Sequence, residues 1–239
     1  VNVEQYDGSS WTEIANLNTA HDSGGGSGTI TNAIVSSGRA YPPGGLLTSN
    51  EYWDGSSWTE VGDLNSARHR CGDAGTVTLA VLFGGDPGTA VTEEWDWTAT
   101  LAAGTWASGN AMNTAREALS SGRIGSTPAG LAAGGSSTAK HNESEEYDGT
   151  SWTEGNNLQT ARSGTASAGT QTAALISGGL ENPPSPPNAQ SEEYDGTNWA
   201  EGNDLNSSRY GAGGMGIQTA ALAAGGHPNT VNVESYDGT

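Results

Sequence analysis

The residues best suited to bind a ligand are basic residues that recur at one position of a repeated unit. Lys and Arg together number only 8 in 239 residues. Ten residues after a repeated tryptophan comes a basic side chain, in order His21, Arg68, Arg116, Arg162 and Arg209. Guanidinium groups bind carboxylates and phosphates through charge-assisted, often paired hydrogen bonds. If the units surround a common axis, these side chains could form a cationic ring that holds an anion or an acidic sugar.

A second interpretation of the same residues is structural. A glutamate recurs two residues before an aromatic residue in every unit: Glu4, Glu51, Glu93, Glu145, Glu192 and Glu234. Residues two apart lie on the same face of a strand, so these carboxylates are placed consistently. One carboxylate is then available for each basic residue, and ion pairs inside the fold would use both. The structural interpretation is favoured, and the ligand-binding one remains a hypothesis.

Further candidate contacts lie in segments whose length differs between units. These segments separate a small pair, such as Gly178-Gly179, from the repeated glutamate. Variable loops on a rigid scaffold often carry binding residues. Tyr41, His141, His227 and the proline-rich stretch 183–187 are therefore candidates. Neutral drift in exposed loops is an equally open explanation.

Catalysis finds little support in the sequence. Cys71 is the single cysteine, and the four His fall in different units and loops. The stretch Gly211–Gly216 has the spacing of a dinucleotide fingerprint but lacks the helix that such a site needs. We therefore predict no catalytic residue, no metal site and no cofactor, and we expect the protein not to be an enzyme. The alternative is an active site at a channel mouth built on the basic ring.

The repeat itself predicts the elements that position these residues. Its tryptophans lie 46 to 48 residues apart, at Trp11, Trp58, Trp106, Trp152 and Trp199. Each unit contains four short segments typical of strands, and Asp-Gly between the third and fourth indicates a tight hairpin. One Trp per unit is more typical of a core between units than of a sugar-stacking surface. Four-stranded units repeated around an axis define a β-propeller, and the small residues of the first strand favour a narrow ring of five blades.

The order Gly-Gly, Tyr, Trp, Arg resembles the kelch repeat and covers nearly the whole chain. The first unit departs from it, with Ser37-Gly38 in place of the Gly pair and His21 in place of Arg. The resemblance implies kelch-type blades in which the Arg holds neighbouring blades together. The wording "YDGTSWTEGNNLQTAR" is similar to propeller arrays of marine phage and environmental sequences. That resemblance implies an extracellular or virion-associated protein, such as a component of a tail fibre or another larger assembly.

We predict one all-β domain over residues 1–239, a five-bladed propeller of four-stranded kelch-like blades. The repeats span approximately 21–64, 67–111, 115–158, 161–205 and 208–237. Residues 1–17 would close the ring, with an N-terminal strand completing the last blade. Because the N-terminal "VNVEQYDG" and the C-terminal "VNVESYDG" are both third-strand sequences, one of them is surplus.

Composition narrows the range of partners. The chain has 27 acidic residues and a net charge of −19, so its surface would repel a nucleic acid backbone. No apolar run approaches the length of a membrane span. We therefore expect a binding or structural module whose partner is a glycan or a host-surface protein. The open alternatives are a lectin with a pocket in several blades and a rigid spacer.

Overall fold

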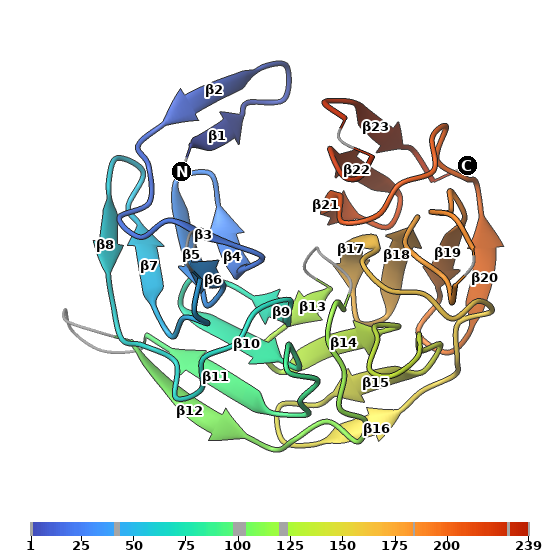
Figure 1. Ribbon diagram of the computed structural model, residues 1–239, viewed down its shortest axis with the longest axis horizontal. Coiled ribbons are helices and arrows are strands. Elements are labelled where there is room, and N and C mark those ends of the chain that lie inside the picture. The colour runs from blue at the N-terminus through green and yellow to red at the C-terminus, as the bar shows by residue number, and fades with distance from the viewer. Residues whose placement is uncertain are drawn as a thin grey trace.

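The computed structural model describes residues 2–40, 44–97, 104–119, 124–183, 185–228 and 230–238. These residues form strands, turns and loops, with no helix among them. Five antiparallel sheets stand around a central axis as the blades of a β-propeller (Figure 1). The prediction of an all-β, five-bladed propeller is therefore confirmed.

The blades follow one another along the chain. Blade 1 contains β4 (Gly25–Thr29), β5 (Asn32–Ser36), β7 (Asn50–Trp53) and β8 (Trp58–Glu60). Blade 2 contains β9 (Gly72–Gly75), β10 (Leu79–Phe83), β11 (Thr92–Asp96) and β12 (Thr105–Gly109). Blade 3 contains β13 (Gly125–Ser126), β14 (Ala129–Ala133), β15 (Ser144–Tyr147) and β16 (Trp152–Glu154). Blade 4 contains β17 (Ala166–Thr170), β18 (Ala173–Ser177), β19 (Ser191–Tyr194) and β20 (Trp199–Gly202).

Blade 5 and the N-terminus depart from this pattern. Blade 5 has three described strands, β21 (Gly213–Ile217), β22 (Ala220–Ala224) and β23 (Val233–Tyr236). The N-terminus forms a separate hairpin of β1 (Val3–Tyr6) and β2 (Trp11–Ile14). Two short strands pair beside blade 1: β3 (His21–Asp22) precedes its first strand, and β6 (Arg39–Ala40) follows its second.

The structure corrects the predicted ring closure. We expected an N-terminal strand to complete the last blade, but β2 pairs with β1 and no N-terminal strand pairs with a strand of blade 5 in the described residues. The reason is that β1 and β23 would occupy the same position beside β22. β23 pairs with β22 in the position that β1 would need, and β2 is held in its own hairpin.

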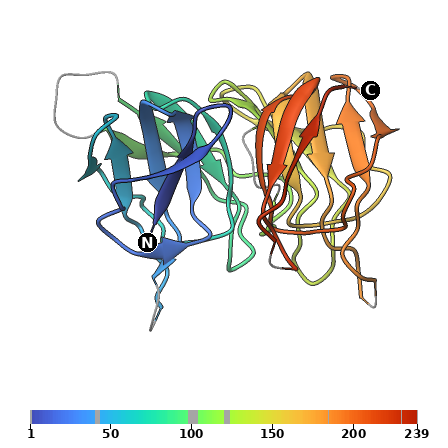
Figure 2. The same ribbon diagram turned by 90° about the horizontal axis from the view of Figure 1, so that it is seen from above.

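Seen from the side, the strands run between the two faces of the ring (Figure 2). We call the face formed by the segments between second and third strands the loop face. These segments are the described residues of 37–49, 84–91, 134–143, 178–190 and 225–232. The basic repeat positions precede the first strands and start from this face. The Asp-Gly hairpins lie on the opposite face.

The inner strands approach one another closely, which explains their small side chains. A Cβ added to Gly214 of β21 would lie 2.2 Å from the backbone N and O of Ser167 in β17. Real Cβ atoms do not approach backbone atoms to that distance, so glycine is required there. The predicted crowding around the axis is thus present between blades 4 and 5.

Larger side chains fill the spaces between blades. Phe83 of blade 2 lies edge-on against Trp152 of blade 3, with ring centroids 4.8 Å apart. The Trp152 indole also donates a hydrogen bond to Thr92 of blade 2 at 3.0 Å. Complete burial of an apolar side chain of this kind contributes about 1.5–3 kcal/mol. Trp106, Trp152 and Trp199 are all buried, as expected for core residues.

Candidate functional site

The side chains of the repeated arginines are buried inside the fold and do not lie on the surface. Each guanidinium forms an ion pair with the repeated glutamate of its own blade: Arg68 with Glu93, Arg116 with Glu145, Arg162 with Glu192 and Arg209 with Glu234. All four Arg are no more than 1% exposed. They therefore present no accessible cationic ring to a ligand in this structure, and the structural interpretation is favoured.

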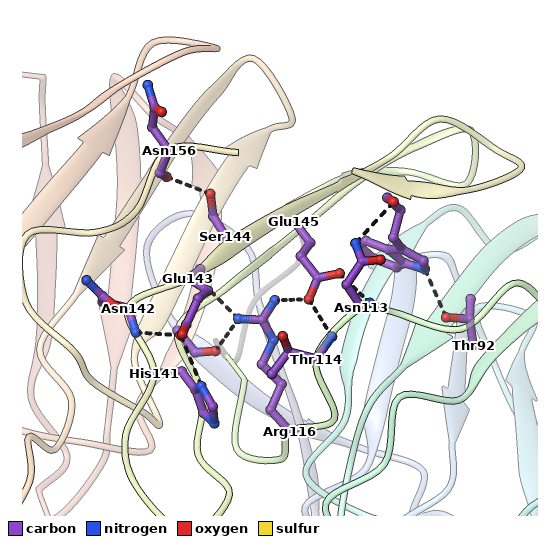
Figure 3. A network of polar contacts seen from close by, with 12 residues as sticks. Thr92, Asn113, Thr114, Arg116, His141, Asn142, Glu143, Ser144, Glu145 and Asn156 are labelled. Carbon is purple, nitrogen blue, oxygen red and sulfur yellow. Dashed lines mark hydrogen bonds and ion pairs between the residues drawn. The ribbon is translucent and has the colours of Figure 1, made fainter. Parts of the chain in front are cut away.

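The pair in blade 3 shows how these groups are bonded inside the fold (Figure 3). Arg116 donates to Glu145 at 2.6 Å and to the backbone oxygens of Gly134 and Glu143 at 3.2 and 2.8 Å. Glu145 also accepts hydrogen bonds from the backbone N–H groups of Asn113 and Thr114. Burial lowers the pKa of Arg116 from its ordinary value, and the Glu145 carboxylate opposes this change. The pair joins the segment entering the blade to its second and third strands.

The first unit replaces this arrangement because it has His21 instead of Arg. Glu51 accepts hydrogen bonds from the backbone N–H groups of Asn18 and Thr19, both at 2.8 Å. Burial lowers the pKa of His21, while Glu51 and Asp22 act in the opposite direction. His21 is thus a half-buried imidazole near a carboxylate that has other donors.

The predicted loop residues are only partly brought together. His227 lies beside Tyr210, with ring centroids 4.9 Å apart. His141 Nδ1 lies 3.0 Å from Glu143. Tyr41 falls outside the described residues, and so does residue 184 of the proline-rich stretch. Among the repeated tryptophans, Trp11 stands apart because it is 42% exposed.

A cavity of about 1670 Å³ occupies the middle of the ring and extends to residues of the hairpin β1–β2. Most of its wall is neutral, because Gly, Ser, Thr and Ala of the inner strands line it. On the loop face the lining is polar and mixed in charge, and includes Arg70, Glu117, Ser136, Lys140, Ser163 and Tyr210. We call these six residues the channel mouth.

Arg70 is an exposed charged residue of the channel mouth. Its side chain is 49% exposed, and Nη1 lies 3.7 Å from Glu117 Oε2. Beside it, His69 Nδ1 lies 3.4 Å from Asp86. Burial and the nearby Arg70 lower the pKa of His69, whereas Asp86 raises it. The mouth therefore combines hydrogen-bond donors and acceptors within one opening.

The backbone shapes this opening. Arg70 donates its N–H to the oxygen of Ser23, and Ala118 donates to Arg70. Gly164 then donates to Ala118, and Gly211 to Gly164, so four hydrogen bonds link the five blades in order. All five residues have positive φ, between 48° and 64°. We call this chain of residues the collar.

Sequence reasoning assigned a possible site at a channel mouth to the basic ring and did not single out the six residues that line the mouth here. Glu117 directly follows the repeated basic position of its unit, and Arg70 lies one residue further along in its own unit. The two residues there differ in every unit, reading DS, HR, EA, SG and YG. That local variation beside a constant residue was the available signal. Lys140 lies in one of the variable segments already considered.

Two properties of the described residues complete the description. No group of three or more His, Cys, Asp or Glu side chains among them is placed to hold a metal ion. In the same residues, no helix is long and apolar enough to span a membrane.

No protein-family model and no curated protein matches the chain. Solved structures do match it. One of them, titled "Structure of YjhT", aligns with a TM-score of 0.78 over 97% of this chain and 85% of its own length. The two sequences are 11% identical, so the similarity shows the β-propeller fold alone.

Proposed function

We propose that this protein is a non-catalytic binding module whose ligand binds at the channel mouth. The distribution of accessible cations carries this proposal. Four of the eight Lys and Arg are used in buried ion pairs. The other Lys and Arg in the described residues are Arg39, Arg70 and Lys140, and all three emerge on the loop face. In a protein of net charge −19, this concentration marks one face as different from the rest.

The ligand class that fits this opening best is a glycan. Arg70 and Lys140 offer donors, Glu117 offers acceptors, and the hydroxyls of Ser136 and Ser163 offer both. Sugar hydroxyls need such alternation, because each can donate and accept. A polyanion fits less well, since the net charge of −19 would repel it.

The buried carboxylates support a binding role over turnover. Glu145 and Glu192 each accept hydrogen bonds from an Arg and from two backbone N–H groups. Both carboxylates are buried and bonded within the fold, so neither is placed to contact a substrate.

The setting that we propose is extracellular or virion-associated, with a host-surface glycan or glycoprotein as the partner. Its support is the resemblance of the repeat wording to phage and environmental propeller arrays, together with the acidic surface. A rigid spacer within a larger assembly is the competing role, and it would require no ligand at the mouth.

The test is binding of the full chain to a glycan array, followed by calorimetry on any glycan that binds. R70A and K140A should weaken binding at least tenfold without lowering the melting temperature. Ala is tolerated at position 70, because Ala118 occupies the equivalent collar position with φ 48°. R39A is the matched control, since Arg39 pairs with Asp22 on the same face but does not line the cavity. Absence of any glycan binding, or equal losses in R39A and R70A, would contradict the proposal.

A further inference from the structure

The contacts that join neighbouring blades stop between blade 5 and blade 1. The collar has four hydrogen bonds, and a fifth would join the Ser23 N–H to the Gly211 oxygen. A second series runs from Gly38, Gly85, Gly135 and Gly179 to the oxygens of Arg68, Arg116, Arg162 and Arg209. Its fifth member would join the Gly226 N–H to the His21 oxygen. Neither fifth bond is formed in the described residues, although all four residues are described.

The hairpin β1–β2 has the geometry of an outer half-blade. Tyr6 pairs with Trp11 and Glu4 with Glu13, the register in which β19 and β20 pair in blade 4. It also contacts blade 1 as a fourth strand contacts the following blade. The segment after β2 donates to Glu51 through Asn18, just as the segment after β20 donates to Glu234 through Asn206. The strands missing from this half-blade are a first and a second strand.

Blade 5 has the complementary form. It supplies a first and a second strand, β21 and β22, and its third strand is held weakly. In blades 1, 3 and 4 the third strand is buried at three of four positions, whereas β23 has no buried position. Val231 lies just before this strand and is 95% exposed, and Val233 is its first residue and is 41% exposed.

Exposed apolar side chains gather at the same place. Seven large hydrophobic residues are exposed in the described part of the chain. Four of them, Met215, Ile217, Val231 and Val233, lie in blade 5, and Trp11 lies in the hairpin. Figure 1 shows the hairpin and blade 5 facing one another across the opening of the ring. Closure would bring these apolar groups out of water.

We infer that β1 and β23 are alternative partners for β22, and that the hairpin β1–β2 can replace β23 and so close the ring. The two strands carry nearly the same sequence, VNVEQY and VNVESY. Exchange differs from the predicted addition of a strand to blade 5, because β23 leaves as the hairpin enters. Glu4 then takes the place of Glu234 opposite Arg209, and Trp11 supplies the fourth strand that blade 5 lacks.

Closure within one chain is favoured over pairing with a second copy. The hairpin is already tethered beside the opening, so its effective concentration at β22 is high. Two copies that each carry a net charge of −19 repel one another. Closure also removes the free edge of β1 and that of blade 5.

Disulfide trapping tests the exchange. In the present arrangement Leu222 lies opposite Ser235, and after exchange it lies opposite Gln5. Cross-strand partners have the Cα separation that a disulfide needs. L222C/Q5C should form a disulfide within one chain under mild oxidation, at a yield independent of protein concentration. L222C/S235C is the control for the present arrangement. Cys71 is common to both, and burial raises the pKa of its thiol to about 11, which keeps it unreactive.

A disulfide in L222C/S235C alone would overturn the inference. Disulfide-linked dimers of L222C/Q5C that increase with concentration would also overturn it, because the partner would then be a second copy.

Thermal unfolding of E4A, E234A and the double variant gives an independent test. If either glutamate can pair with Arg209, E4A has little effect in the parent but a large effect in E234A. The melting temperature of the double variant then falls by clearly more than the sum of the two single shifts. Additive shifts would show that Glu4 never serves Arg209 and would overturn the inference.

Discussion

The substitution R162M separates the structural role of the repeated arginine from a surface role. The Arg162–Glu192 pair is at most 2% exposed, with Nη2 and Oε1 2.5 Å apart. Arg162 also donates to the backbone oxygens of Gly178 and Gln190, at 3.3 and 2.7 Å. Methionine fills a similar space but cannot donate a hydrogen bond. The substitution therefore removes the guanidinium donor from one buried carboxylate and from two backbone oxygens, of which that of Gln190 still accepts the Gly178 N–H.

The magnitude follows from these losses. Removal of one partner from a buried ion pair costs about 3–5 kcal/mol. Each buried acceptor left without a donor adds about 1–3 kcal/mol, although such terms are not additive. Two backbone N–H groups remain on Glu192 and limit the loss. We expect the free energy of unfolding to fall by about 4 kcal/mol, which corresponds to a melting temperature lower by about 8–16 °C in a domain of this size.

The assay is urea unfolding followed by tryptophan fluorescence, with R39M as the matched control. Arg39 pairs with Asp22 at 3.1 Å, but both side chains are more than 40% exposed. An exposed pair contributes about 0–1 kcal/mol, so R39M should change the midpoint little. R162M/E192M should recover part of the loss, because no carboxylate is then buried without its counter-ion. Equal effects of R162M and R39M would refute the structural assignment.

Two further predictions concern the axis and the inter-blade tyrosines. G214A should destabilise the fold by about 1–3 kcal/mol or more, because its Cβ would overlap the Ser167 backbone. G88A is the control and should not destabilise it, since nothing lies within 4 Å of a Cβ added at Gly88. Equal effects of the two substitutions on chemical unfolding would contradict this reasoning. Burial, followed by the hydrogen bond to Glu193, raises the pKa of Tyr236 from 10.0 to about 12. The neutral phenol therefore contributes stability that is fully present below pH 10 and is lost as the pH rises through about 12. Unfolding midpoints across this range should converge for the parent and Y236F, and an unchanged gap would contradict the prediction.

The repeat made the fold and the ion pairs predictable from the sequence. A glutamate and an arginine at fixed positions of one unit must meet in every blade once the strands pair in register. The structure places Arg116 against Glu145 and Arg162 against Glu192 in the same way. Small residues in the first strand likewise indicated crowding at the axis, which Gly214 shows directly.

The channel mouth was not predictable in the same way. Arg70 and Lys140 belong to different units and lie 70 positions apart in the sequence. Both line one opening because the ring brings the loop ends of blades 2 and 3 to the same axis. The arrangement of the N-terminal hairpin was also beyond reach, since β1 and β23 carry nearly the same residues. Sequence alone does not say which of two equivalent strands pairs with β22.

The constant positions of the repeat have a structural role, whereas the variable positions are available for binding. Constant residues such as Arg116 and Glu145 bond to one another inside the blade and are not accessible to a ligand. The collar then fixes the backbone two positions after the basic residue by hydrogen bonds between blades, with Ser, Arg, Ala or Gly at that position. Because the backbone alone makes these bonds, Arg70 can be followed by Ala118 and Gly164 at equivalent positions without loss of the fold. The side chains at the mouth are therefore not needed to hold the fold together. They can vary while the ring stays rigid, and such variation allows a binding site to arise there.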